Sequence, residues 1–168
     1  AYAETQKTAI KALKGLSEEE ITAYNQKVDE ARDAAIAKIN EAATEEGVAT
    51  EVTSGKNVVD GVVTEATTLS EKKLAEAEKL QKAKDAAIQT ITEKAASITA
   101  EIEKLTSLSD DQRTTYKSNV ESTVTKAKTE INAATDEAKV AEAQKTAETD
   151  LGQVLTDAKA ADKKAAEE

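Results

Sequence analysis

Acidic residue pairs are the side chains in this sequence that could hold a metal ion or act as general acid and base. They occur at Glu45 with Glu46 and at Asp110 with Asp111. Both pairs fall where a first helical turn is expected, and carboxylates there are stabilised by the helix dipole. No stretch has the alternating Asp or Asn and the central Gly of a calcium loop. We therefore interpret both pairs as structural and expect no catalytic residue and no metal site.

Other chemistry is limited by the residue types that the chain lacks. It has no His and no Cys, which excludes the usual zinc, haem and thiol sites and every nucleophile–histidine pair. The run Ser54-Gly55-Lys56 resembles the end of a phosphate loop, but the earlier Gly of that motif is absent. We expect no cofactor and no enzymatic activity.

The overall composition is acidic and poor in bulky apolar residues. Of 168 residues, 23 are Lys or Arg and 33 are Asp or Glu, which gives a formal net charge of −10. Nucleic acids and anionic membrane surfaces require basic patches, so neither is an expected partner. No apolar run is long enough to span a bilayer, so we expect no membrane insertion. No secretion signal is recognisable, and we expect a mature fragment of a larger protein.

The chain contains an internal repeat. When it is aligned with itself at an offset of 92 residues, many apolar and turn residues coincide without a gap. A repeated supersecondary unit usually builds an array that acts by its length and surface. Ala1 aligns with Glu93, so we expect the leading helix to be the end of a connecting helix. The matching pairs include Leu13 with Leu105, Leu16 with Leu108, Ser17 with Ser109, Tyr24 with Tyr116, Val28 with Val120, Ile39 with Ile131 and Val48 with Val140.

Two helix starts have the sequence of a capping box. Ser17 is followed by Glu20, and Ser109 by Gln112, each at the third helical position. Leu16 and Leu108 precede these caps and suit a hydrophobic staple. The pattern predicts helices that begin at residues 18 and 110.

Three further helix starts are predicted from weaker signals. Ser70 follows Leu69 and precedes Leu74, which keeps the staple pair but lacks the acidic partner. Thr44 and Asp136 align with each other in the repeat and are candidate caps. Together with a leading segment that ends at Leu13, these signals predict six helices joined by short turns.

The apolar spacing between the caps alternates three and four, which is typical of packed helices. Pro, the residue that most strongly breaks helices, is absent from the whole chain, so long helices are favoured. The predicted fold is all-α: two tandem three-helix bundles that share a long continuous helix over 70–105, in an elongated rod. The domains are predicted as 1–84 and 85–168, with the boundary inside the shared helix. The chain is expected to be a monomer.

The segment 57–63 carries two conflicting signals. Asp60-Gly61 between valines is typical of a β-hairpin turn. The apolar stripe, however, continues through this segment, and the aligned stretch 150–155 has an ordinary helical pattern, so helix is favoured. Val58 and Val63 widen the apolar stripe around Val62, so these three valines are a candidate surface for binding a partner protein. A widened stripe more often packs against two neighbouring helices of the same bundle, and we favour that interpretation.

Three tyrosines are the only aromatic residues. Tyr24 and Tyr116 occupy the same repeat position within apolar stripes. We interpret them as packing residues with the hydroxyl in water, rather than as a ligand platform. Tyr2 aligns with the polar Lys94 and is expected to be exposed.

Several short phrases recur in the chain. They are the two Leu-Ser capping boxes, the phrases RDAAIxxI at 32–39 and KDAAIxxI at 84–91, and INxA at 39–42 and 131–134. With the repeat, they resemble the tandem helical modules of long Gram-positive cell-wall-anchored surface proteins, of the FIVAR type and its relatives. The resemblance implies an extracellular stalk or adhesin module at the cell wall, in series with neighbouring modules of the same polypeptide.

Three functions remain as hypotheses. The leading one is a structural spacer that holds an adhesive domain away from the cell wall. The alternative is a binding module that recognises a host extracellular protein, such as a serum, matrix or mucin protein, or a glycan. A dimeric coiled coil of a cytoplasmic scaffold is the third; it would need apolar stripes that find no partner within one chain.

Overall fold

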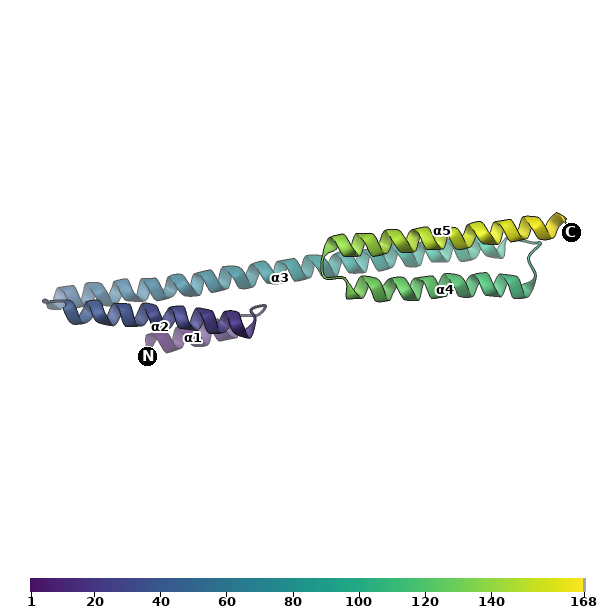
Figure 1. The fold of residues 1–168 in the computed structure, drawn as a ribbon. Helices are drawn as coiled ribbons and strands as arrows, with labels where there is room; N and C mark the ends of the chain where they lie inside the picture. The colour runs from purple at the N-terminus through teal and green to yellow at the C-terminus, as the bar shows by residue number, and fades with distance from the viewer. Residues whose placement is uncertain (168) are drawn as a thin grey trace. The chain divides into compact units, whose positions relative to one another are not determined.

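A computed structural model describes residues 1–167 of the chain. The protein is all-α, as predicted, and the described residues contain no β-strand. Residues 57–63 are helical throughout, so the hairpin alternative is excluded. The helices, labelled in Figure 1, are α1 (Tyr2–Ala12), α2 (Glu18–Glu41), α3 (Glu45–Glu103), α4 (Asp110–Ala133) and α5 (Glu137–Glu167).

The predicted caps begin four of these helices. Ser17 Oγ accepts a hydrogen bond from the Glu20 backbone amide at 3.2 Å, and the Ser17 backbone amide donates one to the Glu20 carboxylate at 2.8 Å. Ser109 and Gln112 form the same reciprocal pair at 3.2 and 2.9 Å. The side chains of Thr44 and Asp136 accept amides three residues ahead, at 3.1 and 2.9 Å. The repeat therefore sets equivalent helix starts in its two halves.

The predicted helix start at Ser70 is wrong, and residues 1–167 form five helices instead of six. α3 continues through Leu69, Ser70 and Leu74 without a break, because the neighbouring residues include no Gly or Pro that would favour a turn. Ser70 is buried, and its hydroxyl donates to the carbonyl oxygen of Lys14 at 2.5 Å. A residue that looked like a cap therefore anchors the turn between α1 and α2 to the middle of α3.

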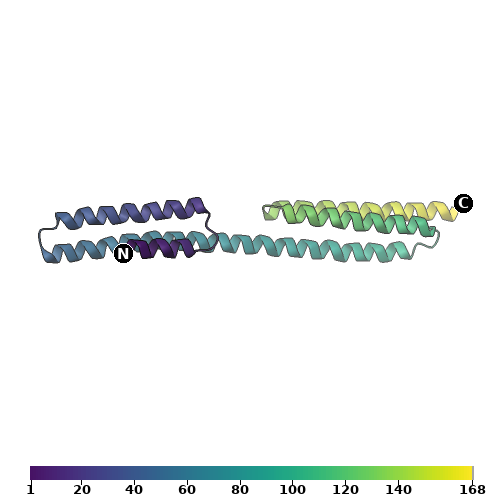
Figure 2. The ribbon, with the colours of Figure 1, turned by 90° about the horizontal axis from the view of Figure 1, so that it is seen from below.

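The chain divides into two compact units, Ala1–Ala77 and a second unit from Glu78 onward. Unit 1 contains α1, α2 and the first part of α3, which lie side by side in both Figure 1 and Figure 2. Unit 2 contains the rest of α3 with α4 and α5, again side by side. The predicted boundary at residues 84 and 85 lies inside the same helix, α3.

The core of unit 2 runs along the whole length of its three helices. Ile91 and Ile102 of α3, Ile131 of α4 and Leu151 of α5 are fully buried, and alanines and valines lie among them in the same cluster. Small aliphatic side chains suit such narrow seams between helices. The buried residues are Ala87, Ile91, Ala95, Ile98, Ile102, Val120, Ala127, Ile131, Ala134, Val140, Ala147, Leu151 and Ala158.

The core of unit 1 is shorter because α1 covers only part of α2 and α3. Figure 2 shows the start of α1 well inside the length of its two neighbours. The buried core residues are Ala3, Ile10, Val28, Val59 and Ala66, and each has a buried equivalent 92 residues later in unit 2. The end of the unit where α2 turns into α3 therefore has two helices where unit 2 has three.

Candidate interaction site

The acidic pairs lie where the sequence predicted them. Glu45 and Glu46 are in the first turn of α3, and Asp110 and Asp111 are in the first turn of α4. All four are exposed. No group of three or more acidic side chains close enough to hold a metal ion occurs in residues 1–167.

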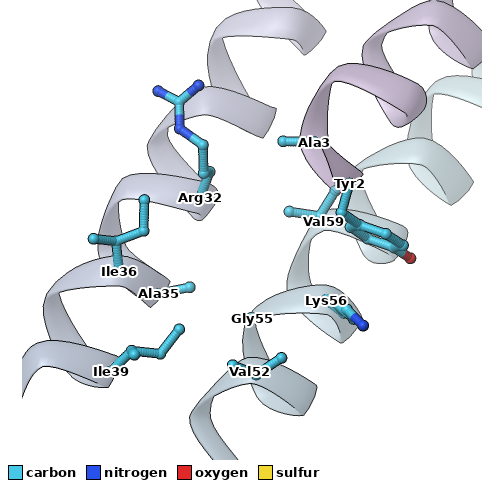
Figure 3. A pocket seen from close by; sticks show the side chains of 10 residues that line it. All are labelled: Tyr2, Ala3, Arg32, Ala35, Ile36, Ile39, Val52, Gly55, Lys56 and Val59. Carbon is cyan, nitrogen blue, oxygen red and sulfur yellow. The ribbon is translucent and has the colours of Figure 1, made fainter. Parts of the chain in front are cut away.

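An apolar groove opens at the two-helix end of unit 1, between α2 and α3. Figure 3 shows Ala35 and Ile39 of α2 across from Val52 and Gly55 of α3, with Tyr2 of α1 at one end. The groove has a volume of about 170 Å³. A dry cavity of roughly 150 Å³ accommodates a benzene-sized group, so the groove has space for a few aliphatic side chains.

Gly55 sets the width of the groove at its floor. A methyl group at this position would overlap the β-carbon of Ala35, so the two helix backbones approach more closely here than any larger residue permits. The aligned residue in unit 2 is Ala147, which is buried. The missing side chain at Gly55 therefore allows α2 and α3 to pack closely at this point.

Comparison of the two units shows which surface the short α1 leaves open. Five residues of unit 2 are at most 7% exposed, yet their equivalents in unit 1 are partly exposed. In addition, Ile36 beside the groove is 48% exposed. Full burial of one Ile or Val is worth about 1.5–3 kcal/mol, so Ile39 and Val48, which are only partly buried, contribute less than Ile131 and Val140. The partly exposed residues are Ala35, Ile39, Ala42, Val48 and Gly55, and their buried equivalents are Ala127, Ile131, Ala134, Val140 and Ala147.

Charged side chains at the rim of the groove are paired. The Arg32 guanidinium contacts Asp29 at 2.7 Å and Asp33 at 2.8 Å. The Asp33 pKa lies below its ordinary value, chiefly because Arg32 donates a hydrogen bond to this carboxylate. Tyr2, expected to be exposed, is instead partly buried; Lys56 lies over its ring and its hydroxyl donates to the carboxylate of Asp60. The groove thus has an apolar floor between charges that already have partners.

The three valines predicted as a partner face have different environments. Val62 and Val63 are partly buried and pack against the core of unit 1. Val58 is 54% exposed and borders a shallow crease between α2 and α3. The sequence reasoning did not identify the groove.

Tyr24 and Tyr116 pack as predicted. Both are partly buried against the cores of their units. The Tyr116 hydroxyl donates to the carbonyl oxygen of Asp157 at 3.3 Å, and the Lys27 ammonium lies 4.9 Å from the centre of the Tyr24 ring.

Among residues 1–167, no helix combines the length and the hydrophobicity that crossing a bilayer requires.

A family model described as Domain of Unknown Function (DUF1542) matches the chain twice, over residues 1–67 and 83–159. The chain therefore belongs to the DUF1542 family and contains two copies of its domain. The two matches confirm the repeat read from the sequence. No curated protein and no solved structure matches the chain.

Proposed function

From this membership in a repeat family, we propose that the chain is a non-enzymatic spacer module of a bacterial cell-surface adhesin. It would stand in the stalk, outside the cell at the wall, in series with neighbouring modules of the same polypeptide. The cell-surface location follows from the resemblance of its repeated phrases to modules of wall-anchored proteins. A spacer has no reactive site and acts through its length and its buried seams.

The observation that carries this proposal is the continuity of α3. The helix has 59 residues, about 88 Å at 1.5 Å per residue, and contributes to the cores of both units. After Gly61 it contains neither Gly nor Pro. A single helix that belongs to two units can transmit force and orientation between them without a flexible linker.

The stretch of α3 around the division of the units is exposed and highly charged. Ala75, Ala77 and Glu78 are exposed, so this stretch depends on its own helix propensity. An ion pair one turn apart supports it: Glu78 contacts Lys82 at 2.6 Å, with Glu on the N-terminal side, which is the more favourable orientation on a helix. These features suit a stiff connection.

Helix continuity can be tested by placing Ala77→Pro in the full chain. Because the protein has no native Cys, spin labels can be attached at Ala23→Cys in unit 1 and Ala133→Cys in unit 2, both of which are exposed. Proline removes a hydrogen bond and kinks a helix, so the distance distribution between the labels should shift and broaden. The control Ala77→Gln should keep the native distribution. If Ala77→Pro left it unchanged, or if the native distribution were already broad, α3 would not act as a stiff connection.

The alternative, a module that binds a host extracellular protein or a glycan, is favoured by one observation. Val58 exposes 54% of its surface on α3, beside the crease lined by residues of α2. Exposed apolar residues of this kind can anchor a partner, although a single valine supplies little binding energy. Screening the chain against serum, matrix and mucin proteins distinguishes this alternative from the spacer.

A further inference from the structure

We propose that the central peptide of the turn before α2, and its equivalent before α4, adopts one of two opposite orientations, and that a matched pair of residues selects which one. The pair is Gly15 with Ser70 in unit 1 and Ser107 with Asp162 in unit 2, and its members lie 55 positions apart. Each member corresponds to its counterpart at the repeat offset of 92 residues. This conformational device within the repeat does not depend on whether the chain is a spacer or a binding module.

The two turns have the same beginning and the same end. In each turn the first leucine donates its amide to a carbonyl oxygen of the preceding helix, at 3.1 Å for Leu13 and 3.2 Å for Leu105. Both turns end in a capping box. Over residues 13–17 the sequence differs from the equivalent stretch 105–109 only at residues 14 and 15. Any difference between the turns therefore arises at their centres.

The central peptide faces opposite ways in the two units. In unit 1 the Ser70 hydroxyl donates to the carbonyl oxygen of Lys14 at 2.5 Å, so the carbonyl side of the peptide faces α3. In unit 2 the Asp162 carboxylate accepts the backbone amide of Ser107 at 2.7 Å, so the amide side of the equivalent peptide faces α5. The C=O and N–H groups of a planar trans peptide point in opposite directions. The same peptide is therefore turned over between the two units.

The residue that follows the central peptide sets one half of the choice. Turning such a peptide over changes the sign of φ at the following residue, as type I and type II turns illustrate. Gly15 has a φ of +84°, whereas no residue other than Gly has a positive φ in residues 1–167, Ser107 included. Glycine adopts a positive φ without the clash that a β-carbon causes. Gly15 therefore permits the inward carbonyl, and Ser107 favours the inward amide.

The anchor residue on the third helix sets the other half. An ionised carboxylate only accepts hydrogen bonds, so Asp162 matches an inward amide. A hydroxyl can donate or accept, and Ser70 donates to the inward carbonyl. Because Ser70 is 3% exposed, water does not relieve a mismatch at this position. Gly with Ser and Ser with Asp are therefore matched pairs, and Gly with Asp is not.

Unit 2 has one further contact at this turn that could be thought to select the orientation. Arg113 donates to the carbonyl oxygens of Glu103 and Leu108, at 2.8 and 3.2 Å. The equivalent residue in unit 1 is Ile21. Both carbonyl groups flank the central peptide and neither belongs to it. Arg113 therefore braces the turn and leaves the orientation to the matched pair.

The first test measures exchange of single backbone amides with deuterium by NMR in the full chain. In the native chain the Gly15 amide faces away from Ser70, and we expect it to exchange at least about tenfold faster than the Ser107 amide, relative to their intrinsic rates. Gly15→Ser should turn the peptide over and slow exchange of the amide at position 15 by at least about tenfold. Lys14→Thr, the other difference between the two turns, is the matched control and should leave this amide unprotected.

The second test is a double-mutant cycle in urea, followed on the NMR signals of unit 1. Ser70→Asp should lower the urea midpoint of the native chain, because its carboxylate meets the Lys14 carbonyl oxygen or forces the peptide out of its preferred orientation. In the Gly15→Ser chain the same substitution should leave the midpoint unchanged or raise it, because the carboxylate then accepts the inward amide as in unit 2. Such a change of sign is expected only of residues that interact directly.

Three results would overturn the proposal. Fast exchange at position 15 in Gly15→Ser would mean that this residue does not set the orientation. An equal loss of stability on Ser70→Asp in the native and Gly15→Ser chains would mean that the two residues are not matched. Loss of protection of the Ser107 amide in Arg113→Ile would assign the choice to Arg113; we expect this amide to stay protected.

Discussion

Ser70 in the middle of α3 donates a hydrogen bond of 2.5 Å to the carbonyl oxygen of Lys14, in the turn between α1 and α2. Ser70 is 3% exposed, so this contact is shielded from water. The turn also contains Gly15, whose φ of +84° lies in the left-handed region, and a side chain on Gly15 would press against Leu74. The bond therefore holds a tight turn onto the helix that the two units share.

Substitution of this serine should distinguish a buried anchor from a helix cap. Ser70→Ala removes the donor and should cost about 1 kcal/mol of unfolding free energy. Ser70→Asp places a carboxylate against a carbonyl oxygen and should cost on the order of 2 kcal/mol or more. Asp is a good cap, so Ser17→Asp and Ser109→Asp should each change stability by less than about 0.5 kcal/mol. Urea unfolding followed by circular dichroism measures all four; equal tolerance of Asp at all three sites would refute the anchor role.

Two glycines of α3, Gly55 and Gly61, should respond in opposite directions to the same change. Gly61→Ala meets no atom within 4 Å and should stabilise unit 1 by up to about 1 kcal/mol, because Ala is the better helix former. Gly55→Ala gains the same propensity, but its methyl group overlaps Ala35, and overpacking of this kind typically costs about 1–3 kcal/mol. Gly152→Ala is a control in unit 2, also with open space around it. Calorimetry of the three variants checks the signs; a stabilising Gly55→Ala would show that α2 and α3 separate without cost.

The sequence predicted those parts of the fold that depend on local chemistry. Ser17 with Glu20 and Thr44 were identified because capping uses residues three or four positions apart. Ser70 was misread because it resembles a cap locally, and its true partner, Lys14, is far away in the chain. The groove was missed for a related reason: whether Ile39 is buried depends on a third helix packing over it, and no feature near Ile39 reports this.

Stability of unit 1 should depend on the ionisation of Glu20. Its carboxylate contacts Lys73 Nζ at 2.6 Å and accepts the Ser17 amide, and these bonds, that from Lys73 first, lower the Glu20 pKa. Because the Glu20 pKa is lower in the folded state than in the unfolded state, the ionised carboxylate stabilises the fold. This stabilisation is complete at pH values above the unfolded pKa, which is about 4.3 for Glu. It is lost as the pH falls through the folded pKa.

Glu20→Gln tests this dependence because it keeps the capping bond and removes the charge. The melting temperature of the variant should lie below that of the native chain at pH 7, and the gap should close below about pH 4. The other capping box already uses Gln112, and its equivalent of Lys73 is Ala165. Gln112→Glu should therefore show a smaller pH effect. A gap between Glu20→Gln and the native chain that persists at pH 3 would contradict the ionic role of Glu20.

The spacer and the binding module make different predictions for Val58. Because Val58 is 54% exposed, Val58→Lys should change the unfolding free energy by less than about 0.5 kcal/mol. Val63→Lys should destabilise unit 1, because Val63 packs against the core. Thr64→Lys, at an exposed position of α3, is the matched control for added charge.

Binding of each variant to immobilised serum and mucin proteins is measured by surface plasmon resonance beside its stability. For a spacer, we expect no specific binding by the native chain and no difference between Val58→Lys and Thr64→Lys. Burial of one valine supplies about 1.5–3 kcal/mol before the cost of association, so any contact centred on Val58 would be weak and fully sensitive to the lysine. If the native chain bound a host protein and Val58→Lys abolished that binding with the fold intact, while Thr64→Lys did not, the binding module would replace the spacer.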